Sequence, residues 1–85
     1  MTLRDFTEQC RTYLPKQGCK IITCDAFLSM NGITYKCTFT HKDKFFALTC
    51  THYNIWRLRC ENELVAETGH TDIAVCCDRY FKEAK

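Results

Sequence analysis

Eight cysteines in 85 residues constrain this chain more than any other feature of its sequence. A chain of this length buries only about 60–65% of the surface that its unfolded form exposes, so its apolar core alone gives modest stability. The cysteine density is typical of a small disulfide scaffold, and an even count permits complete pairing. We therefore predict one disulfide-stabilised domain, residues 1–85, with eight candidate disulfide cysteines: Cys10, Cys19, Cys24, Cys37, Cys50, Cys60, Cys76 and Cys77.

The cysteine density also favours an oxidising compartment, because disulfides persist mainly in secreted and extracellular proteins. The first residues, MTLRDFTEQC, contain no charged segment followed by an apolar one, so the secreted assignment depends on the cysteines alone. The alternative is a cytoplasmic protein whose thiols are reduced core residues. No apolar run in the sequence approaches the roughly 18 residues that a membrane span needs.

The spacing of apolar residues predicts a helix at each end of the chain. After Thr2, which can cap a helix, apolar residues recur at helical spacing until Pro15 and Gly18 end the pattern. A second helix is expected to begin at Thr71 or Asp72 and to carry one apolar stripe.

Between the helices the apolar period changes to two, which is typical of half-buried strands. The alternation is clear in ITYKCTFTH and in the runs that end at Cys50 and Cys60, and weaker in KIITCDAF. Asn31-Gly32 and HKDK favour turns, whereas ENELVAETGH fits either a loop or a short edge strand. The predicted fold is α+β: an N-terminal helix, a four-stranded antiparallel sheet and a C-terminal helix, with both helices on one face.

Most of the cysteines fall on inward faces of these elements, so bridges from helix to sheet are geometrically reasonable. Adjacent residues on a helix point about 100° apart. We therefore expect only one of Cys76 and Cys77 to face the core, and the other to reach sideways to Cys19, Cys24 or a loop. The pairing itself stays open.

Catalytic and metal sites are not predicted. Structural zinc ligands usually come in close pairs such as C-x₂-C, which this chain lacks, and Cys37 and His41 would lie roughly 13 Å apart along a strand. Cys50, His52 and Asp43 could be combined into a nucleophilic site, but no catalytic motif supports that combination. We expect no enzyme activity, no metal and no cofactor.

The outward positions of the strands carry the candidate binding surface, which we assign to Arg57, Arg59, Lys36 and Phe45. A basic, partly aromatic sheet suits nucleic acid, and the order of elements is similar to that of double-stranded RNA-binding domains. Those domains have a basic cluster at the start of their last helix, where this chain has Asp72. Because the net charge is also only +2, we expect a protein partner rather than a nucleic acid.

The segment WRLRC, Trp56 to Cys60, resembles the Trp-Arg-aliphatic/aromatic-Arg motif of secreted fungal effectors of the Leptosphaeria avirulence-suppressing type. These are cysteine-rich α+β proteins with a four-stranded antiparallel sheet and several disulfides. The resemblance covers four residues. It implies that Trp56 packs in the core while Arg57 and Arg59 lie on the outer face. It also implies a secreted, non-enzymatic effector, able to enter a host cell, that acts by protein binding on a host receptor or target in immune modulation. The alternative function is an intracellular interaction module that binds RNA.

Overall fold

The structure is a computed structural model that describes residues 1–30, 32–69 and 72–82. It contains two α-helices, α1 (Leu3–Tyr13) and α2 (Ile73–Phe81), and a short 3-10 helix, η1 (Leu14–Gln17). The strands lie between them in sequence: β1 (Lys20–Ser29), β2 (Gly32–His41), β3 (Lys44–Cys50), β4 (Ile55–Cys60) and β5 (Glu63–Gly69).

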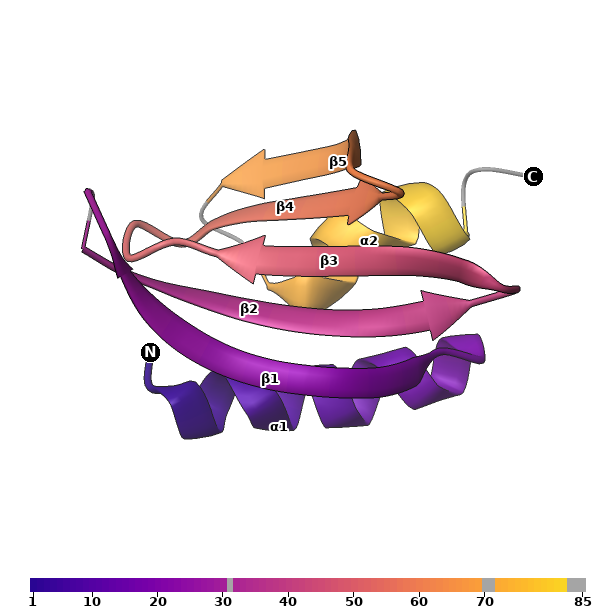
Figure 1. Cartoon of the computed structure of the whole chain (residues 1–85), viewed down its shortest axis with the longest axis horizontal. Helices are drawn as coiled ribbons and strands as arrows, with labels where there is room; N and C mark the ends of the chain where they lie inside the picture. The colour runs from indigo at the N-terminus through magenta and orange to yellow at the C-terminus, as the bar shows by residue number, and fades with distance from the viewer. Residues whose placement is uncertain (31, 70–71, 83–85) are drawn as a thin grey trace.

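The strands form one antiparallel sheet in the order β1-β2-β3-β4-β5, and both helices cover the same face of it (Figure 1). Helix α1 packs against β1 and β2, and α2 packs against β4 and β5. The α+β class and the one-sided helix layer are as predicted. The predicted number of four strands is wrong, because the sheet has five.

The additional strand is β5, which lies in the segment that fits either a loop or an edge strand by sequence. It pairs with β4, but the register shifts between Leu58 and Arg59. Such a bulge sets two residues of one strand against one of its partner and breaks the alternation of inward and outward side chains. Ala66 and Thr68 are buried while Leu64 is exposed, so no simple period of two runs through the strand.

Hairpin turns at two places use residues with positive φ. Lys42 and Asp43 join β2 to β3 with φ values of 50° and 65°, and Glu61 and Asn62 join β4 to β5 with 51° and 70°. Two consecutive left-handed residues match the twist of antiparallel strands. The HKDK turn is confirmed. Asn31 of the expected Asn31-Gly32 turn lies outside the described residues.

Side-chain caps define where both helices begin. The Thr2 hydroxyl accepts a hydrogen bond from the Asp5 N–H, and the Asp5 carboxylate accepts one from the Thr2 N–H. In α2 the Asp72 carboxylate accepts from the Val75 N–H; the alternative start, Thr71, lies outside the described residues. Each such cap is worth about 1 kcal/mol.

The core lies between the helices and the inner face of the sheet and is rich in stacked aromatic rings. Phe6 of α1 stacks on Tyr35 and Trp56, with ring centroids 5.6 and 5.7 Å away. Phe39 and Phe46 stack on neighbouring strands, with centroids 5.2 Å apart. Trp56 is fully buried, as predicted. Burial of these large side chains contributes about 1.5–3 kcal/mol each and is the main source of stability.

Cys76 and Cys77 are both fully buried, so the prediction that only one of them faces the core is wrong. Helix α2 has neighbours on two sides. It packs on the sheet, where the Cys76 thiol hydrogen-bonds to Thr68, and it also contacts α1. Two side chains that point about 100° apart can therefore both be buried.

Candidate functional site

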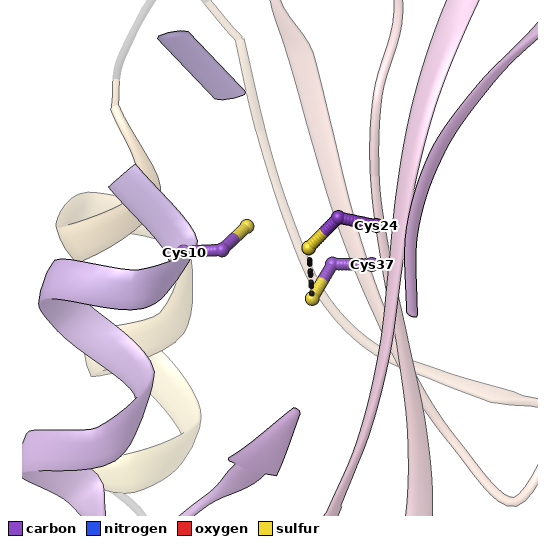
Figure 2. A group of neighbouring side chains, drawn as sticks. All are labelled: Cys10, Cys24 and Cys37. Carbon is purple, nitrogen blue, oxygen red and sulfur yellow. Dashed lines mark hydrogen bonds between the residues drawn. The ribbon is translucent and has the colours of Figure 1, made fainter. Parts of the chain in front are cut away.

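Three cysteines from three different elements converge beneath the sheet. Cys10 of α1 points toward Cys24 of β1 and Cys37 of β2, as Figure 2 shows. Their sulfur atoms all lie within 4.8 Å of one another. We call Cys10, Cys24 and Cys37 the thiol triad.

The local structure explains why the triad assembles. Cys10 follows Phe6 by four residues and precedes Leu14 by four, so it lies on the buried stripe of α1. Cys24 and Cys37 are direct cross-strand partners in the β1–β2 register, and both side chains point to the inner face. Cross-strand partners have Cβ atoms about 4.5–5.5 Å apart, which brings the two sulfurs together.

Burial and thiol hydrogen bonds raise the pKa of two members of the triad, Cys24 and Cys37. The Cys24 and Cys37 sulfurs are 3.3 Å apart and hydrogen-bonded. Burial raises the pKa of Cys24 to about 12. The hydrogen bond with Cys10, together with burial, raises the pKa of Cys37 above its ordinary value. At neutral pH Cys24 and Cys37 are therefore thiols rather than thiolates.

This arrangement allows two kinds of chemistry. Oxidation of Cys24 and Cys37 would form a cross-strand disulfide, because the Cα separation of direct partners falls within the range that a disulfide spans. Alternatively, three sulfur atoms could bind one metal ion. In the described part of the chain, the triad is the one group of three or more cysteine, histidine or carboxylate side chains close enough to share an ion.

The remaining cysteines are also free thiols, so the structure does not show the disulfide bonds expected from the sequence. The Cys19 sulfur lies 3.8 Å from Nδ1 of His41. Burial raises the pKa of Cys19 and of Cys50 to about 11 each. A nucleophilic cysteine needs a lowered pKa, so neither of these thiols is activated.

The outer face of the sheet, opposite the helices, carries a row of residues with one from each strand: Asp25, Lys36, Thr49, Arg57 and Glu67. Arg57 forms an ion pair with the Glu67 carboxylate. Lys36 lies directly opposite Asp25 in the register. The positive side chains of this row therefore have acidic neighbours across the strands, and such pairs contribute roughly 0.2–1 kcal/mol each.

A second part of the outer face combines apolar and positive groups. Arg59 lies between Ala47 of β3 and Leu64 of β5, and Phe45 is its diagonal neighbour on β3. Phe45 and Leu64 are 42% and 48% exposed. Among the described residues Arg59 forms no ion pair. We call Phe45, Arg59 and Leu64 the Arg59 patch.

A groove of about 790 Å³ lies between α1 and α2 on the other side of the molecule. Its polar lining includes Asp5 and Asp72, whose carboxylates cap the two helices. Tyr13 in the same groove donates its hydroxyl hydrogen to Asp78, which joins the helices. The bond from Tyr13, together with one from the Ile73 N–H to the Gln9 side chain, joins the two helices. Among the described residues that line it, the groove contains no cysteine.

The structure places all four predicted surface residues on the outer face, but in two groups. Lys36 and Arg57 belong to the charged row, and Phe45 and Arg59 to the patch. Leu64 was missed because β5 was not assigned. The thiol triad was missed because the signal that could have found it, the pairing of Cys24 with Cys37, depends on the strand register.

No family model, no curated protein and no solved structure matches this chain. No helix in the described ranges is long and apolar enough to cross a membrane.

Proposed function

We propose that this chain is a non-catalytic protein-binding domain that recognises its partner through the outer face of the sheet. The Arg59 patch carries this proposal. It joins an arginine without an ion-pair partner among the described residues to two half-exposed apolar side chains, Phe45 and Leu64. Arginine and aromatic residues dominate the binding energy of protein interfaces, and charges at the interface core are otherwise depleted.

The charge pattern of the outer face favours a protein over a nucleic acid. Arg57 is paired with Glu67, and Lys36 lies opposite Asp25. Nucleic-acid binding depends on unpaired lysine and arginine side chains that neutralise phosphates. Arg57 is therefore already occupied by Glu67 and is less available to a phosphate, whereas mixed charges around an apolar patch suit a protein surface.

The Cys19 and Cys50 thiols do not support a catalytic role. Burial raises the pKa of Cys19, although His41 is its neighbour, and burial also raises the pKa of Cys50. Neither thiol has the thiolate character that covalent catalysis requires.

A second candidate is the same binding domain in an extracellular setting, as a secreted effector-type protein that meets a host receptor or target. The observation that favours it is the Cys24–Cys37 pair, whose sulfurs are 3.3 Å apart at directly opposed strand positions. In an oxidising compartment this pair needs only a small approach to form a bond.

Binding through the patch is tested by comparing the immobilised wild-type chain with Arg59→Glu and with Lys16→Glu. Lys16 is an exposed residue of η1, away from the outer face, and its change alters the net charge equally. Proteins retained from a leaf extract, chosen because the resemblance to fungal effectors implies a plant host, are identified by mass spectrometry. We expect a protein that wild type and Lys16→Glu retain and Arg59→Glu loses. An unchanged set, or retention abolished by nuclease, contradicts the proposal.

The extracellular setting is tested by the intact mass of protein purified from an oxidising preparation, before and after reduction. Each disulfide lowers the mass by about 2 Da, so full pairing of eight cysteines gives a difference of roughly 8 Da. Eight thiols that can be alkylated without reduction would contradict this second candidate and leave the binding proposal intact.

A further inference from the structure

We propose that the thiol triad of the reduced protein binds one copper(I) ion through the sulfur atoms of Cys10, Cys24 and Cys37. The triad lies on the inner face of the sheet, so this site is separate from the Arg59 patch and independent of the binding function proposed above. It makes the chain a binding protein for a soft monovalent cation.

The sulfur positions fit one shared ion. Metal–sulfur bonds of about 2.3 Å in a planar three-ligand arrangement require sulfur atoms roughly 4.0 Å apart. The triad sulfurs lie within 4.8 Å of one another, and the Cys24–Cys37 distance is 3.3 Å. Shifts of less than about 1 Å in side-chain positions would bring all three to the required separation.

The ligand set selects the metal. All three donors are sulfur, and thiolate ligands favour copper(I) and zinc over magnesium, calcium or manganese. Structural zinc takes four protein ligands in a tetrahedron. The cluster among the described residues supplies three ligands. The imidazole of His41 contacts a thiol outside the triad, that of Cys19. Three-coordinate binding is normal for copper(I), so the triad is complete for that ion.

The surroundings of the triad supply an entry path and a compensating charge. Cys10 and Cys37 are fully buried, whereas Cys24 on edge strand β1 is half-buried and gives access from solvent. The positive charge of Arg11 acts on Cys24. A buried anionic complex is costly unless a charge of opposite sign lies nearby, and Arg11 offers that partner.

Binding at this site is a ligand exchange without electron transfer. Copper enters as copper(I) and stays copper(I). Each thiol that becomes a thiolate ligand forms a copper–sulfur bond, breaks its S–H bond and releases its proton to solvent. Oxidation of Cys24 and Cys37 to a disulfide would remove two of the three ligands, so the site exists only in the reduced protein.

The site is tested on the fully reduced chain under anaerobic conditions, with copper(I) supplied by a chromophoric chelator that competes for the ion. We expect one copper(I) per chain in wild type. Cys24→Ser, the change at the half-buried position, should weaken binding more than the roughly 10–100-fold that loss of an outer-shell partner costs. Cys50→Ser is the control, because it makes the same substitution at a cysteine outside the triad. It should keep wild-type affinity.

A second measurement needs no variant and so does not depend on any variant's folding. Lysine and arginine residues place each triad cysteine on its own tryptic peptide. Mass mapping of alkylation over time should show that one equivalent of copper(I) slows modification of Cys10, Cys24 and Cys37 but not of Cys19 or Cys50. Protection of all cysteines alike, or of none, overturns the proposal. So do equal affinities of wild type and Cys24→Ser, and a nitrogen or oxygen ligand in the X-ray absorption spectrum of the complex.

Discussion

The two faces of the sheet are built from alternate residues of the same strands, yet they carry different kinds of side chains. Phe45 and Phe46 are neighbours on β3; Phe45 is 42% exposed on the outer face, and Phe46 is fully buried among aromatic rings on the inner face. The inner face and the helices that cover it supply the large buried side chains and the thiol triad, whereas the outer face carries the Arg57–Glu67 ion pair and the Arg59 patch. The residues that stabilise the fold and the residues of the proposed binding surface are therefore separated by a single residue step along the strand.

The largest expected effect compares these two phenylalanines directly. Phe46→Ala removes a ring that stacks on Phe39 and contacts Tyr80, so it should lower the free energy of unfolding by about 3–5 kcal/mol. Phe45→Ala on the outer face should cost less than about 1 kcal/mol. Denaturant unfolding of both variants measures the difference. Equal losses of unfolding free energy would mean that the outer face is also packed, and would contradict the difference between the two faces.

The next effect is a pH dependence that belongs to the inner face. Burial raises the pKa of Cys50 from 9.0 to about 11, so the folded chain keeps a proton that the unfolded chain loses above pH 9. Stability is therefore complete below about pH 9 and falls as the pH rises toward 11. One such proton contributes at most about 1.4 kcal/mol per pH unit. Unfolding of the reduced protein measured against pH should show a shallower decline in Cys50→Ala; an identical decline contradicts the assignment.

A smaller effect is expected where the two helices meet. Tyr13→Phe removes only the hydroxyl that donates to Asp78 across the α1–α2 contact. A hydrogen bond of this kind contributes about 0.5–1.5 kcal/mol. Thermal unfolding should show a modest loss with unchanged circular dichroism. A loss as large as that of Phe46→Ala would mean that the helix layer, rather than the sheet packing, controls stability.

The smallest effect is expected on the outer face. Arg57→Ala breaks the ion pair with Glu67, whose two side chains are 36% and 47% exposed, and exposed pairs are worth about 0–1 kcal/mol. The stability difference between wild type and Arg57→Ala should shrink further in high salt, because salt screens exposed charges. A difference that salt leaves unchanged would show that Arg57 acts through packing of its stem rather than through its charge.

Much of the fold follows from local signals in the sequence. The Thr2 cap, the helical spacing that buries Phe6 and Cys10, and the period of two that buries Phe39 all act over a few residues. The inward position of Trp56 and the outward positions of the arginines beside it follow from the same alternation. Strand β5 was not assigned from the sequence because its bulge interrupts the alternation of apolar and polar residues. In addition, the turn before it, Glu61-Asn62, adopts positive φ without a glycine.

The sequence by itself thus determined which side of α1 and of the regular strands faces the core, because periodicity is a local property. Only the tertiary structure decided which side chains meet. The pairing of Cys24 with Cys37 depends on the strand register, and the approach of Cys10 depends on how α1 lies on the sheet. The burial of both Cys76 and Cys77 likewise depends on α1 as a second neighbour of α2. These contacts join segments far apart in the chain, and residue spacing along one element carries no information about them.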